Sequence, residues 1–369
     1  MPEHPYVVLS CAVSLDGYLD DATPERLLLS NDADFDRVDA LRASCDAILV
    51  GAGTVRADNP RLLVRSADRR AARVARGEPA SPLRVVLSAS GDLDRKAAVF
   101  TAAPPDSDPP DSDPPETVVF SGSLSDLLDD LAKRGVRRLM VEGGASVLTA
   151  FLAEDLADEL QIATAPFLIG DPAAPRAFGP AQFAQSPGRR MILADSASLG
   201  DVGFARYLAA RERSTDGDFL RLTIELSRSS PPSLRAYSVG AIVVDGDGEV
   251  ISTGYSRELL RGLGDPDKNH AEEVALAKLT RGAAQPDPRL ASATIYTSLE
   301  PCSPRASRPL SCTDHILAAG IPRVVLALRE PALLAACDGA DRLRAAGVEV
   351  VELPELAYLV RAVNDHLLQ

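Results

Sequence analysis

The sequence has little of what marks a secreted or membrane protein. It contains five cysteines, four histidines and no tryptophan in 369 residues, and no apolar stretch approaches the roughly 18 residues that cross a membrane. The start, MPEHPYVVLS, lacks the basic region and cleavage site of a signal peptide, so we expect none. So few cysteines exclude a disulfide scaffold. We therefore expect a cytoplasmic protein with reduced thiols.

The sequence also lacks an excess of positive charge, because its formal net charge is −14 at pH 7. This excess of acidic residues would repel the phosphate backbone of nucleic acids and anionic membrane surfaces, so we expect neither as a partner. A small phosphorylated substrate stays compatible, since a few arginines inside a pocket can outweigh the overall sign. The length and the 46% hydrophobic content are typical of two globular domains.

The first half alternates short apolar runs with helical patterns, which predicts an α/β sheet. Strands are expected at 6–13, 47–50, 83–87, 117–120 and 136–141, with helices after Ser123 and over 145–156. The low-complexity segment 102–116, AAPPDSDPPDSDPPE, is expected to be a loop inside the first domain.

A polar segment at 211–218, RERSTDGD, predicts the domain boundary. The expected domains are therefore residues 1–212 and 213–369. In the second one a helix is expected over 219–226. Two strands, at 239–244 and 250–254, are joined by the turn sequence Asp-Gly-Asp-Gly, which predicts a hairpin.

One histidine, one glutamate and two cysteines form the clearest motif of the second half. His270 and Glu272 begin an apolar-periodic helix, Cys302 follows a strand expected at 294–297, and Cys312 opens another helical pattern. The order resembles the signature of the cytidine-deaminase superfamily. That resemblance implies that His270, Cys302 and Cys312 bind Zn²⁺, with Glu272 as the catalytic carboxylate.

The residue types suit this chemistry. One neutral imidazole and two thiolates leave the fourth tetrahedral position of zinc for water, whose pKa falls to about 7. Glu272 would carry the proton from that water to the ring nitrogen and then to the leaving amine. A lone cysteine is usually a small buried hydrophobe, but here the motif is complete and in order. Glu273 is expected to be a solvated neighbour and His315 a structural residue.

Nine residues separate the two cysteines, whereas nucleoside deaminases usually have two. The insert, Cys302-Ser-Pro-Arg-Ala-Ser-Arg-Pro-Leu-Ser-Cys312, resembles the pyrimidine deaminases of riboflavin biosynthesis, and among them the fungal-type branch. Arg305 or Arg308 could grip a substrate phosphate bidentately. A solvated loop is the equal alternative for either arginine.

Three ordered motifs in the first half also resemble one family. They are Ser14-Leu-Asp-Gly17, the run DAILVGAGTVRADNPRLLVR at 46–65, and Glu142-Gly-Gly144. Over residues 5–208 they resemble the riboflavin-pathway reductase domain, a relative of dihydrofolate reductase that uses NADPH. The implied fold class is α/β, a dihydrofolate-reductase-like domain followed by a cytidine-deaminase-like α/β/α domain. No Gly-x-Gly-x-x-Gly is present, so a Rossmann fold is not expected.

The resemblance also implies individual roles in the reductase domain. NADPH would contact Ala12, Thr54, Asp58 and Gly144, and the substrate would contact Arg42, Leu62, Arg65 and Glu142. Arg65 would be the main phosphate anchor and Asp58 would orient the reacting ribose. The alternative for Thr54 and Asp58 is a capped turn, because Asp-Asn-Pro is turn chemistry. The family suggests a homodimer through this domain.

Both halves indicate one pathway, riboflavin biosynthesis. The first domain would reduce the ribosylamino side chain of a pyrimidinone 5′-phosphate, and the second would replace a ring amino group by oxygen. The reductase-first order and the fungal-type insert favour reduction before deamination. Two alternatives stay open: a related pyrimidine substrate in specialised metabolism, or one domain that has lost catalysis and serves as a binding or assembly module.

Overall fold

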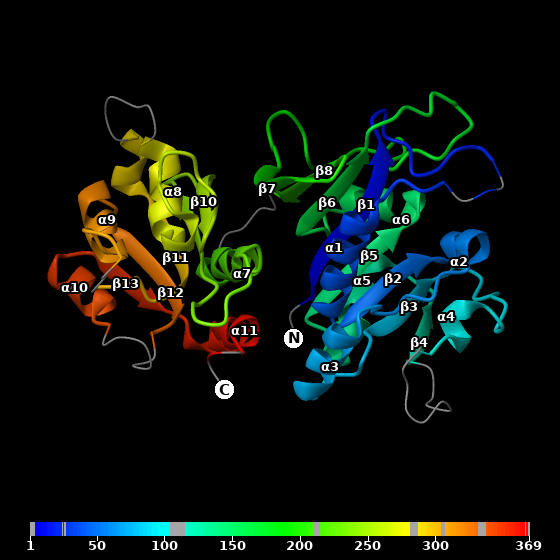
Figure 1. Ribbon diagram of the computed structural model, residues 1–369, viewed down its shortest axis with the longest axis horizontal. Helices are drawn as coiled ribbons and strands as arrows, with labels where there is room; N and C mark the ends of the chain where they lie inside the picture. The colour runs from blue at the N-terminus through cyan, green and yellow to red at the C-terminus, as the bar shows by residue number, and fades with distance from the viewer. Residues whose placement is uncertain are drawn as a thin grey trace. The chain divides into compact units, whose positions relative to one another are not determined.

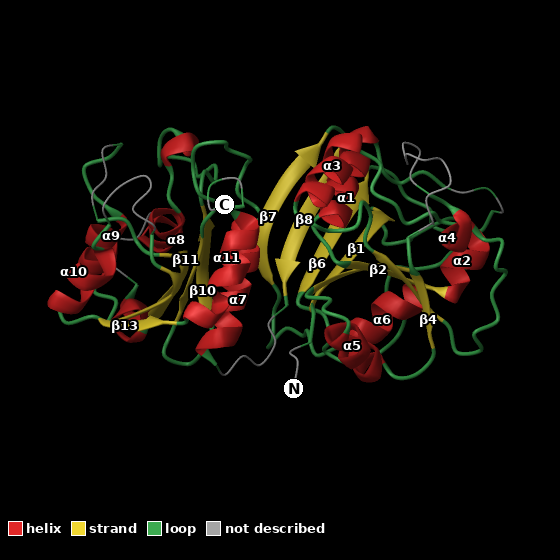
Figure 2. Ribbon diagram, turned by 90° about the horizontal axis from the view of Figure 1, so that it is seen from below, coloured by secondary structure: helices red, strands yellow, loops and turns green. Residues whose placement is uncertain are grey.

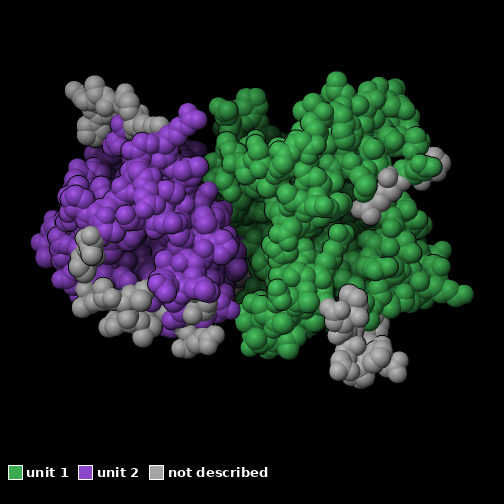
Figure 3. All heavy atoms as spheres, viewed as in Figure 1, with its two compact units in different colours: residues 1–211 green, residues 212–369 purple. Residues whose placement is uncertain are grey.

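The structure is a computed structural model and describes residues 4–23, 25, 27–103, 115–209, 215–280, 287–303, 307–330, 337–365 and 367. The chain divides into two compact units, Met1–Arg211 and Glu212–Gln369 (Figure 3). None of the helices in these described ranges is long and apolar enough to span a bilayer.

The first unit is built on an eight-stranded sheet. Its strands are β1 (Tyr6–Ser14), β2 (Ala47–Gly51), β3 (Leu83–Leu87), β4 (Thr117–Phe120), β5 (Arg138–Gly143), β6 (Glu159–Ala165), β7 (Ile192–Leu199) and β8 (Val202–Leu208). Their order is β4-β3-β2-β5-β1-β6-β8-β7. The strands from β4 to β6 are parallel, and β8 and β7 continue antiparallel. The carboxyl ends of β1, β2 and β5 therefore meet at one edge of the sheet.

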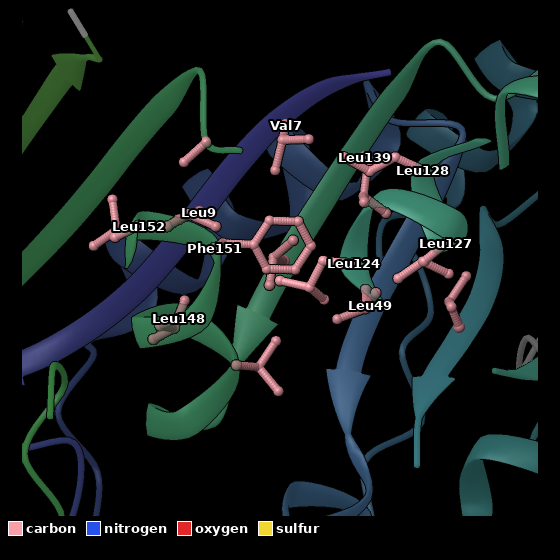
Figure 4. Packing of buried hydrophobic residues seen from close by; sticks show 14 of the residues in the cluster. Val7, Leu9, Leu49, Leu124, Leu127, Leu128, Leu139, Leu148, Phe151 and Leu152 are labelled. Atoms are coloured by element: carbon pink, nitrogen blue, oxygen red, sulfur yellow. The ribbon is translucent and has the colours of Figure 1, made fainter. Parts of the chain in front are cut away.

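Helices cover both faces of this sheet. They are α1 (Asp32–Ala43), α2 (Ala52–Asp58), α3 (Ala67–Ala75), α4 (Ala98–Thr101), α5 (Leu124–Lys133) and α6 (Ala145–Ala153). Helices α1 and α3 lie on one face, α5 and α6 on the other (Figure 2). Because side chains alternate along a strand, Val7 and Leu9 join the core with Phe151 of α6 (Figure 4), whereas Val8 packs with Leu41 of α1.

The second unit is a three-layer α/β/α fold around a five-stranded sheet. The strands are β9 (Gly240–Val244), β10 (Val250–Tyr255), β11 (Thr294–Leu299), β12 (Arg323–Leu328) and β13 (Glu349–Glu352), in the order β10-β9-β11-β12-β13. The helices are α7 (Asp216–Ser227), α8 (Ala271–Thr280), α9 (Cys312–Ala319), α10 (Gly339–Ala345) and α11 (Ala357–Val363). Helices α7 and α11 lie on one face of the sheet and α8 to α10 on the other (Figures 1 and 2).

Two glycines let helices approach this sheet closely. A Cβ atom at Gly240 would lie 2.1 Å from the carbonyl oxygen of Thr223 in α7. One at Gly254 would lie 2.3 Å from the carbonyl oxygen of Ala271 in α8. Both distances are far below van der Waals contact, so only glycine fits, and α7 is held tightly against β9 and α8 against β10.

The α/β fold class and the order of the two domain types agree with the expectations. Strands β3 and β4 have the expected bounds, and α5 begins after its N-cap Ser123, whose side chain accepts from the Asp126 amide. Helix α1 and strands β6 to β8 were not predicted. Helix α1 was missed because its sequence, DADFDRVDALRA, shows little apolar periodicity.

Candidate active sites

The second unit brings the three expected zinc ligands together. His270 directly precedes α8, Cys302 follows β11, and Cys312 is the first residue of α9. The Nδ1 atom of His270 lies 3.5 Å from Sγ of Cys302 and 3.4 Å from Sγ of Cys312. Zinc bonds of about 2.3 Å to sulfur and about 2.0 Å to nitrogen at tetrahedral angles put N and S about 3.5 Å apart. The residues therefore fit a tetrahedral zinc ion, with Nδ1 as the imidazole ligand atom.

Charge in this cluster favours a thiolate. The Cys312 thiol donates to Cys302, and with His270 nearby this lowers the pKa of Cys302 to about 4. The same bond, together with burial, raises the pKa of Cys312. The backbone N–H of Cys312 also points to Sγ of Cys302 at 3.4 Å. A capping box at Ser311 fixes the start of α9, so the second cysteine has a defined position.

Glu272 lies beside the three ligands and is 3% exposed. Burial, and then the negative charge of Cys302, raise the pKa of its carboxyl group. Oγ1 of Thr297 lies 2.8 Å from Oε1 of Glu272. Thr297 is not among the site residues that the sequence predicts. One feature of the sequence could have identified Thr297: it is a polar residue two positions after the core residue Ile295, and therefore lies on the same buried face of β11.

The residues around the ligands correct one expectation. Glu273 is not solvated, because it is 4% exposed and its Oε1 lies 3.4 Å from Nε of Arg308. Arg308 also donates to Oδ1 of Asn269 at 2.5 Å. These contacts hold Arg308 against Asn269 and Glu273, on either side of His270 in the sequence, so they favour a structural role over a phosphate grip. Arg305, the other candidate, lies outside the described residues.

The first unit has two adjoining cavities at the sheet edge where β2 and β5 end. The larger, of about 510 Å³, is lined by Thr54, Asp58, Asn59, Arg61 and Leu62 among others. The smaller, of about 170 Å³, is lined by Ser10, Ala12, Phe35 and Arg37 among others. Arg42, Arg65 and Glu142 line both cavities. The structure thus gathers seven of the eight expected reductase residues around these cavities: Ala12 lines the smaller one, Thr54, Asp58 and Leu62 line the larger one, and Gly144 is in neither lining.

Arg42 and Glu142 form an ion pair that lines both cavities. Nε and Nη2 of Arg42 lie 2.6 and 2.7 Å from the two carboxylate oxygens of Glu142, a bidentate geometry. Arg65 stacks over Phe35, with 5.2 Å between the guanidinium carbon and the ring centre. Asp39 accepts from the backbone N–H of Arg65, which fixes the loop that carries it. These contacts orient two guanidinium groups at the cleft.

The larger cavity fits a phosphate-bearing cofactor. Gly144 is the N-cap of α6 and makes no side-chain cap bond, so this helix start, next to the cavity residue Thr54, is suited to a phosphate group. A Cβ atom there would lie 3.1 Å from Oγ1 of Thr54, which makes glycine the residue that keeps this approach open. Leu62 lines the same cavity with φ of 52°, a left-handed backbone that is uncommon for leucine.

Residues 5–202 match the family described as the RibD C-terminal domain, over more than half of the chain. The chain belongs to this family. Downstream of the RibD C-terminal domain, residues 213–328 match the cytidine and deoxycytidylate deaminase zinc-binding region. The expected order, a RibD-type reductase domain and then a cytidine-deaminase-like domain, is therefore confirmed, and with it zinc and NADPH as the cofactors of the two domain types.

Relatives match one half of this RibD-family chain each. A 2,5-diamino-6-ribosylamino-4(3H)-pyrimidinone 5′-phosphate reductase of Archaeoglobus fulgidus is 39% identical over 45% of this chain and 82% of its own. A diaminohydroxyphosphoribosylamino-pyrimidine deaminase of Schizosaccharomyces pombe is 36% identical over 37% of this chain and 31% of its own. Among solved structures, RibD of Acinetobacter baumannii is 27% identical, with a TM-score of 0.47 over 56% of this chain and 59% of that chain.

Proposed function

We propose that the chain is a bifunctional enzyme of riboflavin biosynthesis. Residues 1–212 reduce the ribosylamino side chain of a pyrimidinone 5′-phosphate with NADPH, and residues 213–369 deaminate its ring hydrolytically with zinc. The observation that carries the proposal is the set of Nδ1 and two Sγ atoms, all within 4.8 Å of one another, with the buried Glu272 beside them. The cleft with Arg42 and Glu142 supports the reductase half.

In the deaminase half, His270, Cys302 and Cys312 hold the ion. Zinc, when bound there, supplies Lewis-acid activation of water at neutral pH. Glu272 takes a proton from water with Oε1 or Oε2, gives it to the ring nitrogen, and later assists departure of the amine as ammonia. Glu272 is 3% exposed, which keeps bulk water away from its carboxyl group. Burial also raises the pKa of that group, which suits a residue that must both accept and release a proton.

In the reductase half, Thr54, Asp58, Gly144 and Ala12 bind the cofactor, which supplies the hydride. Arg42 and Glu142 hold each other in position and present polar groups to the substrate, while Leu62 forms the apolar wall. Arg65 binds the 5′-phosphate, and its stacking on Phe35 holds the guanidinium group in a fixed orientation at the cleft. Glycine at 144 lets the backbone approach the cofactor phosphates. In the deaminase half, Arg305 is a further candidate for the phosphate.

Assays of the full chain test both reactions at once. Purified protein should contain about one zinc per chain, release ammonia from the pyrimidine substrate, and oxidise NADPH in the presence of the ribosylamino substrate. Protein purified without chelators that contains no zinc would disprove the deaminase half. Failure of NADPH to bind to the full chain would favour the alternative in which the first unit is a binding or assembly module.

We further propose that reduction precedes deamination. The archaeal relative is named for a reductase that acts on a pyrimidinone with both amino groups present. A ribityl chain is open and flexible, whereas a ribosyl group can close into a ring, so a pocket shaped for one discriminates against the other. The deciding assay offers the diamino ribosyl substrate without NADPH. Rapid ammonia release under that condition would show that deamination does not wait for reduction.

The remaining proposals concern the substrate class, the assembly and the compartment. A related pyrimidine of specialised metabolism is the alternative substrate, and comparing kcat/KM for the two pyrimidines decides between them. The family resemblance supports a homodimer through the reductase unit, which sedimentation analysis tests. All five cysteines are free of disulfides, which supports a reducing compartment such as the cytoplasm.

A further inference from the structure

Thr297 is a buried polar residue that the proposed mechanism does not use. It lies on β11, the central strand of the five-stranded sheet, and is 0% exposed. It shares a face of β11 with Ile295, which packs in one cluster with Ala271 and Ala275 of α8. The sheet therefore fixes its backbone, and its hydroxyl faces the helix that carries Glu272.

The Thr297 hydroxyl lies between two oxygens. Its Oγ1 is 2.8 Å from Oε1 of Glu272 and 2.9 Å from the carbonyl oxygen of Leu299. A hydroxyl carries one proton and two acceptor lone pairs. It can therefore donate to only one of these oxygens at a time, and the carbonyl of Leu299 can only accept.

The contact to Glu272 fixes one oxygen of its carboxyl group. When the Thr297 hydroxyl donates to Oε1, that oxygen has a hydrogen-bond partner on a central strand whose backbone the sheet holds in place. Rotation of the carboxyl group about its last torsion is thereby restricted.

We propose that Thr297 is a positioning residue of the deaminase site, whose hydroxyl holds the Glu272 carboxyl group in one orientation. This inference depends on the proposed deamination. A buried hydroxyl that only satisfied the strand would need a single acceptor, and the carbonyl of Leu299 already provides one. The second, equally short contact to Glu272 is what a positioning role requires.

The test compares Thr297→Val, which removes the hydroxyl at nearly constant volume, with Thr297→Ser, which keeps it. We expect Thr297→Val to lower kcat for deamination by about 10- to 100-fold, as for loss of a hydrogen bond to a charged group. KM should stay within about threefold, because substrate contacts are unchanged. Thr297→Ser should restore kcat to within about threefold of the wild type. Zinc content and NADPH oxidation should be unaffected in both variants.

Thr223→Val is the matched control. Thr223 is equally buried, at 0% exposed, and its hydroxyl donates to the carbonyl of Phe219 within α7 at 2.8 Å. Removing that hydroxyl should leave kcat for deamination unchanged. Equal losses in Thr223→Val and Thr297→Val would show a general packing effect and overturn the inference.

A crystal structure supplies a readout that does not depend on activity. In Thr297→Val the Glu272 carboxylate should leave its wild-type position, and in Thr297→Ser it should stay. An unmoved carboxylate and a kcat within about twofold of the wild type in Thr297→Val would overturn the inference. If the wild-type chain releases no ammonia, the proposed deamination is wrong, and the position of the carboxylate still decides whether Thr297 holds Glu272.

Discussion

The two candidate sites differ in how much of their geometry is fixed before anything binds. In the second unit, Cys312 and Glu272 are 0% and 3% exposed, and the ligand atoms already have tetrahedral spacing. In the first unit, the site consists of two adjoining cavities, of about 510 Å³ and about 170 Å³. The ion pair of Arg42 and Glu142 lines both of them. The deaminase half must admit the pyrimidine and a water molecule. The reductase half must admit the pyrimidine together with NADPH, a second large molecule.

This contrast teaches where each half is vulnerable. A site of few, mutually dependent atoms loses everything when one is removed, because no neighbour can replace a ligand. A cleft with many contacts loses activity in steps, because each contact supplies a share of the binding and orientation. The following substitutions test this difference, in order of decreasing effect.

Cys302→Ala should have the largest effect. It removes one of three protein ligands, so zinc content should fall from about one per chain to near zero and deamination should stop. NADPH oxidation should continue, because Cys302 belongs to the other unit. Metal analysis and the two activity assays check this. Cys337→Ala, a cysteine outside the ligand set, is the control, and zinc loss in that variant would contradict the assignment of the ligands.

Glu272→Gln should keep zinc and lose deamination by about 10³-fold, since general acid–base catalysis typically contributes 10²- to 10⁴-fold. Glutamine preserves the shape but cannot carry the proton. The control is the neighbouring Glu273→Gln, which should retain kcat within a few fold, because Glu273 pairs with Arg308 and has no part in the proposed proton transfer. Near-normal turnover in Glu272→Gln would mean that another group moves the proton.

Arg42→Ala should lower kcat/KM for NADPH oxidation by about 10²-fold, the cost of a lost bidentate contact and of an unpaired Glu142. Deamination should not change. The exposed Arg56, on α2, provides the control, and Arg56→Ala should retain near-wild-type reduction. A loss of both activities in Arg42→Ala would mean that the two halves are coupled, which would remove the contrast drawn above.

Asp216→Asn should have the smallest effect, on stability alone. Hydrogen bonds from Arg323 and then Tyr296 lower the pKa of Asp216. A carboxyl group with a depressed pKa stabilises the fold above its unfolded-state pKa, near 4, and loses that contribution as the pH falls through the folded-state pKa.

The variant should therefore unfold about 2–4 °C below the wild type at pH 7, from about 1 kcal/mol for a partly exposed pair. The difference should begin to shrink near pH 4 and disappear once the pH is below the depressed folded-state pKa of Asp216. Calorimetry should show the shift in the transition of the second unit only. A constant difference down to pH 3 would mean that the ion pair is not its source, and Asp247→Asn, in an exposed turn, is the control.

The sequence by itself predicted the three proposed zinc ligands and much of the framework. Few residue types bind zinc, so His270, Cys302 and Cys312 stand out in a chain with four histidines and five cysteines. Strands buried on both faces consist of continuous apolar runs, which is why β2, with the sequence AILVG, was predicted to within one residue. Helix α5 was predicted because its cap and its apolar period agree.

Only the tertiary structure decided which polar groups meet. Arg42 and Glu142 are separated by 100 residues and pair because α1 packs on the strand that ends near Glu142. From the sequence Glu273 was expected to be a solvated residue, whereas in the structure Arg308 of the insert lies against it. Thr297 reads as an ordinary strand residue until α8 places Glu272 above its hydroxyl. The physical reason is that a side chain's residue type limits which bonds it can form, whereas its partner depends on which segments the folded core brings within about 3 Å.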